Sequence, residues 1–197
     1  MLRSFYSVFV FIFLLASNLG FAAQKWTVDL NGKDGKVEFH AVGRPSLIKI
    51  NGKGDAPKGW ITLDNGKISS AITFDLKSLD TGIDKRNEHM KVKYLEVEKY
   101  PEARLALTEV NFPNPAPSGE FSDIPVSFKG NLTLHGVTRP IEGNSKVGGS
   151  GGKIKVVANF ETKISDYKMP VPSFSGITVA DKVQIEIDFS APLQIQK

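Results

Sequence analysis

Alternation of apolar and polar residues dominates the chain beyond its N-terminal segment. Over 67–76, 126–134, 153–164 and 183–195, apolar side chains recur at every second position, with polar or charged residues between them. Successive side chains of a strand point to opposite faces, so this pattern predicts strands with one buried and one solvated face. Several such segments in one chain predict an antiparallel, all-β fold.

Residues that tolerate a positive φ separate these segments at short intervals. They are Asn31-Gly32, Asp34-Gly35, Asn51-Gly52 and Asn65-Gly66. The triplet Asp64-Asn65-Gly66 predicts a tight hairpin, because both central residues of such a turn need a positive φ. The spacing predicts roughly eight to ten strands in a sandwich or a barrel.

One charged stretch, 84–100, departs from the alternation. It predicts a short helix near Lys85 to Leu95 that ends before Pro101, because the residue preceding a proline avoids the helical conformation. Helical spacing allows one inward stripe, made of Ile83, Met90 and Tyr94. By analogy with other barrels, such an insertion is expected to plug or cover one barrel end.

The N-terminus reads as a signal peptide over 1–22. Arg3 precedes an apolar run over 5–16, and small residues before the expected cleavage after Ala22 complete the pattern. This run of about 12 residues is shorter than the roughly 20 that a spanning helix needs. We therefore expect a periplasmic or secreted protein, not spanning a membrane, whose residues 23–197 form one domain.

Composition excludes several functions. The chain has no cysteine, so it forms no disulfide and performs no thiol chemistry. Its net charge of +4 comes from interspersed charges rather than a basic stripe, which argues against nucleic-acid binding. The histidines, His40, His89 and His135, are too far apart in sequence to suggest a metal site.

The sequence motifs give little indication of a catalytic site. The densest polar cluster is Arg86-Asn87-Glu88-His89, but adjacent residues on a helix do not face each other. We expect Arg86 and His89 to pin the insertion to neighbouring strand ends instead. The chain has no G-x-S-x-G elbow and no glycine-rich phosphate loop, so a hydrolase or nucleotide-binding protein is not expected.

The interior of such a fold is the remaining candidate site. A closed barrel of about eight strands either fills its interior with side chains or holds one small ligand. Small inward residues would leave room, namely Ser70, Gly130 and Ala158. The alternative is an interior filled by Phe74, Phe128, Phe160 and Phe189.

Two separated motifs resemble the YceI-like family. The first comprises Leu79-Asp80-Thr81-Gly82, Arg86-Asn87-Glu88-His89-Met90-Lys91, Tyr94-Leu95 and Lys99-Tyr100-Pro101-Glu102-Ala103. The second runs from Gly130 to Pro140 and is similar to the signature G-x-L-T-x-x-G-V-T-x-P. The resemblance implies an exported, lipocalin-like antiparallel β-barrel with a short helical segment. Characterised members of the family hold a polyisoprenoid chain, and some carry an isoprenoid quinone.

This chain departs from the family pattern at two places. Asn87 stands where the family often has aspartate, and Val37-Glu38-Phe39-His40 matches the opening strand only loosely. Asp166-Tyr167 is similar to a family pair. The motif residues are interpreted as structural, including Arg86, His89 and Tyr94.

The resulting hypothesis is a non-enzymatic carrier for an apolar isoprenoid-type lipid. Parity on the strands selects the residues of the ligand cavity as Ile72, Phe74, Phe128, Leu132, Val156, Phe160, Ile185 and Ile187. Two alternatives stay open: an envelope stress or interaction protein with a filled core, and an enzyme that uses Arg86 and His89. No cofactor is expected beyond a bound polyisoprenoid or isoprenoid quinone, and pairing as a homodimer is left open.

Overall fold

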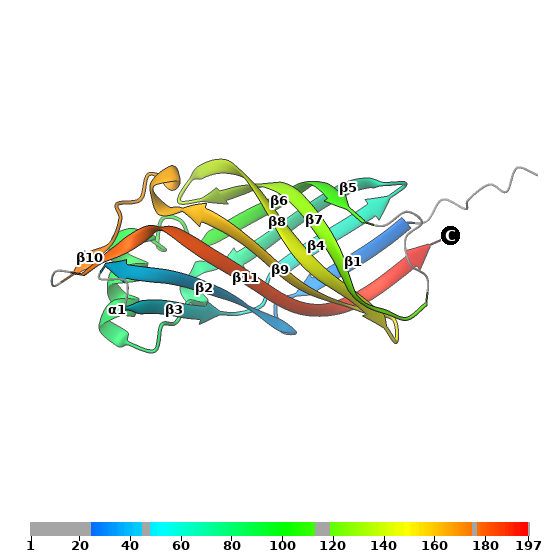
Figure 1. Cartoon of the computed structure of the whole chain (residues 1–197), viewed down its shortest axis with the longest axis horizontal. Helices are drawn as coiled ribbons and strands as arrows, with labels where there is room; N and C mark the ends of the chain where they lie inside the picture. Colours follow the sequence, from blue (N-terminus) through cyan, green and yellow to red (C-terminus); the bar gives the residue numbers. More distant parts are fainter. Residues whose placement is uncertain (1–24, 45–47, 113–118, 175–176, 197) are drawn as a thin grey trace, which may run out of the picture.

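The computed structural model describes residues 25–44, 48–112, 119–174 and 177–196. The predicted signal peptide lies outside the described residues. Figure 1 shows an elongated barrel with α1, β3 and β10 at one end and the C-terminal end of β11 at the other.

Strands make up most of the described chain, with four short helical segments between them. The helical segments are η1 (Leu76–Ser78), α1 (Asp84–Glu88), the π-helical η2 (His89–Tyr94) and η3 (Ile164–Tyr167). The strands are β1 (Lys25–Asn31), β2 (Gly35–Arg44), β3 (Lys49–Gly54), β4 (Lys58–Asp64), β5 (Lys67–Asp75), β6 (Glu102–Asn111), β7 (Phe121–Leu134), β8 (Val137–Ser150), β9 (Lys153–Lys163), β10 (Ser173–Phe174) and β11 (Ile177–Gln196).

Closure of the barrel depends on β11. Its first part pairs with β2 and its last part pairs with β1, while β9 pairs along its other edge. The strands β1 and β2 therefore lie end to end along β11, and β4 and β3 lie end to end along them. The ring β1-β4-β5-β6-β7-β8-β9-β11 closes as an antiparallel barrel of 8 strands, which confirms the predicted fold.

A glycine near the start of β4 allows this strand to lie close to β5. Gly59 is the second residue of β4 and has a φ of 125°. A Cβ there would lie 1.9 Å from the carbonyl oxygen of Ala71 on β5. Only a residue without a Cβ allows the two backbones to approach this closely.

The helical insertion replaces strand pairing where β5 ends. Beyond Asp75, the outer edge of β3 pairs only briefly, through backbone hydrogen bonds of 2.9 and 2.7 Å between Lys53 and Asp80. The segments α1 and η2 follow and run from Asp84 to Tyr94, which confirms the helix predicted near Lys85 to Leu95. The Leu95 N–H bonds to the Met90 carbonyl at 2.9 Å, a π-type bond that widens the last turn.

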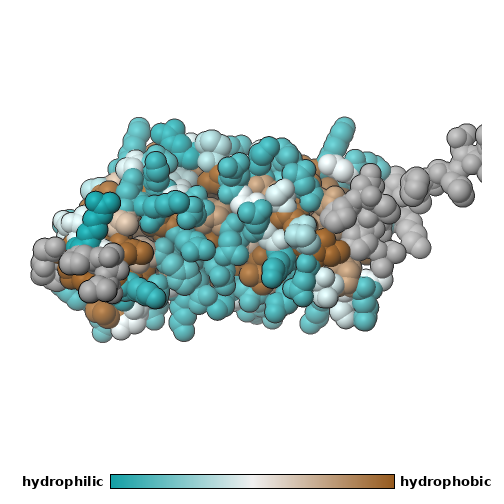
Figure 2. All heavy atoms as spheres, viewed as in Figure 1, coloured by the Kyte–Doolittle hydropathy of each residue, from teal (hydrophilic) through white to brown (hydrophobic). Residues whose placement is uncertain are grey.

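The predicted alternation places the core inside the barrel. On β7, for example, Val126, Phe128 and Leu132 are buried while the residues between them are exposed or backbone-only glycine. Polar side chains cover much of the outer surface seen in Figure 2. The strand faces therefore separate an apolar interior from a solvated exterior.

Two of the small residues expected to leave space in the interior do not do so. The Leu107 N–H donates to Ser70 Oγ at 2.8 Å, and a Cβ on Gly130 would lie 2.8 Å from the Ala106 carbonyl oxygen. Both sites adjoin the irregular register between Leu107 and Glu109 on β6. These positions accommodate a β-bulge, so the expectation was wrong for them.

Replacing Gly59 with alanine is expected to lower the free energy of unfolding by about 3 kcal/mol, because the backbone is strained and the Cβ meets the Ala71 carbonyl. The matched control is Gly148→Ala, whose Cβ would have no neighbour closer than 3.4 Å. That change should cost less than about 1 kcal/mol. Urea unfolding measures both, and equal stabilities would contradict the role assigned to Gly59.

Candidate functional site

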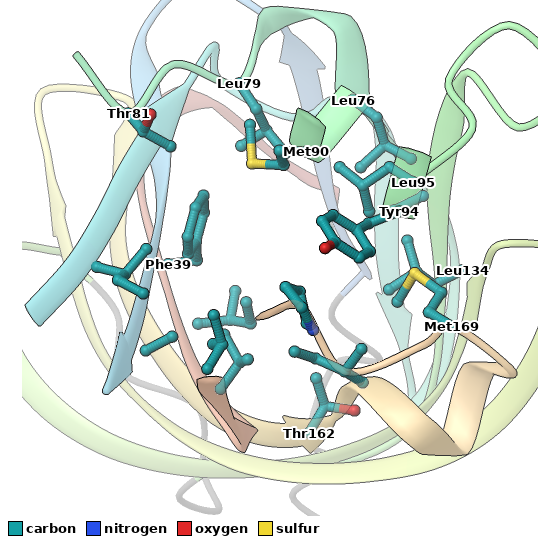
Figure 3. A pocket seen from close by; sticks show the side chains of 18 of the residues that line it. Phe39, Leu76, Leu79, Thr81, Met90, Tyr94, Leu95, Leu134, Thr162 and Met169 are labelled. Carbon is teal, nitrogen blue, oxygen red and sulfur yellow. The ribbon is translucent and has the colours of Figure 1, made fainter. Parts of the chain in front are cut away.

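A large apolar cavity of about 530 Å³ occupies the barrel end that carries the helical insertion. Figure 3 shows the labelled side chains around an open space, with Met90, Tyr94 and Leu95 on the helical side. Phe39 faces them from β2, and Thr162 lies on β9. The cavity therefore lies between the barrel wall and the insertion.

A second cavity of about 130 Å³ lies deeper in the barrel, towards the end that carries β1. Its lining is apolar apart from Ser145, whose hydroxyl already donates to the Val126 carbonyl at 3.1 Å. The two cavities share Ile72, Leu105 and Ile187. The interior is thus a two-part space rather than a filled core.

All eight residues predicted from strand parity line one of these cavities. The larger cavity takes Ile72, Phe74, Leu132, Phe160, Ile185 and Ile187. Phe128 and Val156 line the smaller one, together with Ile72 and Ile187. Their part in binding a ligand stays a prediction.

The predicted inward stripe of Ile83, Met90 and Tyr94 lines the larger cavity, but strand parity missed the rest of the side formed by β2, β3 and the insertion. The lining residues missed there include Val37, Phe39, Ala41, Ile48, Ile50, Leu76, Leu79 and Leu95. The alternation of Val37, Phe39 and Ala41 could have identified part of this wall. The residues of the insertion could not be found by parity, because they do not belong to a strand.

The polar part of the lining is cationic or neutral. Lys85, Arg86 and His89 come from the helical insertion, and Lys163 comes from the end of β9. None of the described residues that line the larger cavity is aspartate or glutamate. The polar side of this lining can face a polar or anionic group, while the apolar side accepts hydrocarbon.

Within the insertion, Asn87 holds the loop that precedes α1. Its Oδ1 accepts hydrogen bonds from the Thr81 N–H at 2.8 Å and the Thr81 hydroxyl at 2.7 Å. Its Nδ2 donates to Asp80 Oδ1 at 2.7 Å. The residue that departs from the family pattern therefore makes the loop's main side-chain contacts.

Arg86 acts on the same loop. Its Nη2 donates to the Thr81 carbonyl at 2.6 Å, whereas we expected it to reach a neighbouring strand end. Its Nε is buried and has no hydrogen-bond partner among the described residues. Spacing alone misled the prediction, because the loop folds back over the helix it precedes.

The pKa of Asp80 is lowered, first by the Gly82 N–H and then by the Asn87 amide. A carboxyl whose pKa is lowered by folding stabilises the folded state above its ordinary pKa. That contribution is lost as the pH falls through the lowered pKa. Acid is therefore expected to loosen the loop.

Tyr94 fastens η2 to the opposite rim. Its hydroxyl contacts the backbone of Ser173 on β10, with the Ser173 N–H at 3.3 Å and the Ser173 carbonyl at 3.4 Å. Both distances are long for hydrogen bonds. The contact is consequently a weak one.

His135, from the motif that runs from Gly130 to Pro140, joins three separate segments of the chain near the larger cavity. His135 Nε2 lies 2.5 Å from Glu96 Oε2, and its Nδ1 lies 3.3 Å from the Tyr167 carbonyl oxygen. The His135 ring packs on Tyr100 with centroids 4.4 Å apart. Tyr167 is fully buried and accepts a hydrogen bond from the Thr162 hydroxyl, and burial raises its pKa. These contacts support a structural role for the motif.

Among the described residues, no group of three or more histidine, cysteine or acidic side chains could hold a metal ion. Within the same ranges, no helix is long and apolar enough to cross a membrane. His40 Nδ1 lies 3.1 Å from Asn51 Oδ1 on the adjacent strand.

The fold and the cavity define the class as a closed antiparallel β-barrel with an apolar internal cavity covered by a helical insertion. The model of the YceI-like domain matches residues 26–191. The chain therefore belongs to the YceI-like family.

Curated relatives agree with this assignment. A UPF0312 protein of Pectobacterium carotovorum is 30% identical over 142 residues, covering 70% of this chain and 69% of the relative. The protein YceI of Salmonella agona is 29% identical over 147 residues, covering 73% and 72%.

Solved structures show the same fold. A domain from Saccharophagus degradans, described as polyisoprenoid binding and implicated in plant cell wall breakdown, matches with a TM-score of 0.64 and 18% identity. It covers 86% of this chain and 98% of that domain. BcnA of Burkholderia cenocepacia matches with a TM-score of 0.61 and 20% identity, covering 79% and 96%.

Replacing Asn87 with alanine should lower the free energy of unfolding by about 1–3 kcal/mol, because partly buried donors lose their acceptor. Amide hydrogen exchange should also accelerate over 80–95. The control is Glu88→Ala, which removes only an exposed ion pair with Lys85 and should cost less than about 1 kcal/mol. Unchanged exchange in the Asn87 variant would contradict the role given to this residue.

Proposed function

We propose that this protein binds a long, apolar, isoprenoid-type chain inside its barrel. The observation that carries the proposal is the apolar cavity of about 530 Å³ under the helical insertion. Each CH₂ group moved from water into such a space contributes about 0.8 kcal/mol. A hydrocarbon chain of modest length thus gains enough free energy to bind without any specific polar contact.

The comparisons support this class of ligand. The Saccharophagus degradans domain of the same fold is described as polyisoprenoid binding. Membership of the YceI-like family agrees with it. The head group, a quinone or another polar group, would lie towards Lys85 and Arg86, which are polar residues of the lining.

A barrel with a filled core is the alternative that the cavity disfavours. Phe128, Phe160 and Phe189 are buried, yet the larger cavity remains beside Phe160 and the smaller one beside Phe128 and Phe189. An interaction protein would gain nothing from this internal space. Binding also needs no catalytic group, so we infer a carrier or buffer rather than an enzyme.

We further propose that the carrier acts outside the cytoplasm, in the periplasm or after secretion. The support is the signal-peptide pattern over 1–22, with cleavage expected after Ala22. An apolar chain cannot cross an aqueous gap alone, so a carrier is useful there. The intact mass of protein taken from the periplasm should correspond to a chain that begins at Ala23. The uncleaved mass in the membrane fraction would contradict cleavage after Ala22 and release from the membrane.

Filling the larger cavity with a side chain should block binding. Ala41 is 5% exposed and lines the larger cavity, whereas its neighbour Val42 is 44% exposed on the outer face of β2. Ala41→Trp should weaken the binding of a long prenyl alcohol at least about tenfold, or about 1.4 kcal/mol. Val42→Trp is the matched control and should bind normally.

Thermal unfolding of both variants shows whether each is folded before binding is compared. Binding is measured by displacement of a fluorescent fatty chain. Equal binding by folded Ala41→Trp and Val42→Trp proteins would place the ligand elsewhere and overturn the proposal.

A further inference from the structure

We propose that the smaller cavity is a second compartment that receives the distal end of a long chain, and that Ile72, Leu105 and Ile187 form a neck that decides which chains reach it. The proposal rests on the proposed function, because it takes the larger cavity as the site of the rest of the chain. It adds a determinant of chain length within the barrel.

The neck lies where the two cavities meet. Ile72 and Leu105 are cross-strand partners on β5 and β6, and Ile187 lies on β11. In the ring of strands, β11 is on the side opposite β6. The three side chains therefore narrow the interior from opposite walls, and all three line both cavities.

Two phenylalanines fix the wall beside the neck. Phe160 lines the larger cavity and Phe128 the smaller one, and their rings meet edge to face with centroids 6.5 Å apart. Both pair with Gly143 on β8, where a Cβ would lie 2.6 Å from Phe128 Cζ and 2.9 Å from Phe160 Cβ. Because Gly143 has no side chain, both phenylalanines pack directly against its backbone, so this wall is rigid.

The aliphatic side of the neck can yield. Ile72 and Ile187 are only partly buried, and aliphatic side chains change rotamer within picoseconds to nanoseconds when they have space. A flexible, unbranched part of a chain can therefore pass between them. A bulky head group cannot, so the chain enters with its apolar end first.

The size and polarity of the smaller compartment suit the end of a hydrocarbon chain. Its volume of about 130 Å³ is close to that of an engineered apolar cavity of roughly 150 Å³ that binds benzene. A terminal isoprene unit has a similar bulk. Lining residues such as Val28, Leu30 and Ile154 are buried aliphatics that offer no competing polar contact.

Trp26 makes occupation of this compartment measurable. Its indole lines the smaller cavity, is 4% exposed, and has no acceptor for its N–H among the described residues. The chain's other tryptophan, Trp60, is 42% exposed on β4 and lines neither cavity. In a Trp60→Phe protein, emission therefore reports the smaller compartment alone.

The test uses this Trp60→Phe protein, stripped of lipid by unfolding and refolding, with farnesol, geranylgeraniol and solanesol as probes. Native mass spectrometry first establishes which alcohols bind. We expect farnesol to bind without changing Trp26 emission and solanesol to bind with a clear blue shift. Geranylgeraniol, whose prenyl chain is intermediate in length, shows whether a chain of that length passes the neck.

Substitutions in the neck should then change the chain length that is needed to reach the smaller compartment. Ile187→Phe should retain solanesol binding but lose at least about four-fifths of the emission shift, because the ring closes the neck. Ile185→Phe is the matched control on the same face of β11, and it lines the larger cavity only. It should weaken all three alcohols alike and retain the shift with solanesol.

The outcomes separate the two proposals. Solanesol bound with unchanged Trp26 emission, an equal shift with farnesol, or a full shift in folded Ile187→Phe protein would each overturn the second compartment while leaving the lipid-binding function intact. Binding of none of the alcohols would overturn the function itself. The series on the Trp60→Phe protein is decisive even where a neck variant fails to fold.

Discussion

The pairing of β11 with both β1 and β2 is the interaction on which the rest of the structure depends. An open sheet would leave one row of backbone N–H and carbonyl groups unpaired at each edge. Here the last residues of β11 pair with β1, so the ring closes at the end that carries the C-terminus. At the other end β11 pairs with β2, and β3 extends the wall.

The barrel wall is complete at the end that carries the C-terminus and has a gap at the end that carries the helical insertion. Because β5 ends at Asp75, the wall beyond it lacks a strand next to β3. The insertion takes that place with a loop held by Asn87 and a π-type turn fastened by Tyr94. A strand there would bring its own ladder of hydrogen bonds and a flat inner face. The helical segment instead stands away from the wall and leaves the cavity beneath it.

Sequence patterns predicted the features of the fold that depend on residues close together in the chain, namely strand faces, a turn and a helix. Alternation on β7, β9 and β11 indicated which faces point inward, and Asn65-Gly66 predicted its turn, where both residues have a positive φ. The helix near Lys85 to Leu95 followed from its spacing and from Pro101. The resemblance of two motifs to the YceI-like family added the closed barrel, which the structure confirms, and the class of ligand, which stays a proposal.

Features that depend on distant pairing could not be predicted in this way. Nothing near Gly59 in the sequence shows that its backbone approaches Ala71, and the end-to-end placement of β1 and β2 depends on their register along β11. For the same reason Ser70 was interpreted as making space, whereas it fills a bulge on β6. The neck at Ile72, Leu105 and Ile187 joins strands far apart in sequence, so only the folded ring brings these residues together.

The most direct test of the central claim is native mass spectrometry of protein purified from a bacterial host without detergent. The account predicts a mass of the folded protein increased by one apolar molecule per chain, which organic extraction releases and which disappears on denaturation. Folded protein that carries no added mass, and that takes up no prenyl chain when one is supplied, would contradict it.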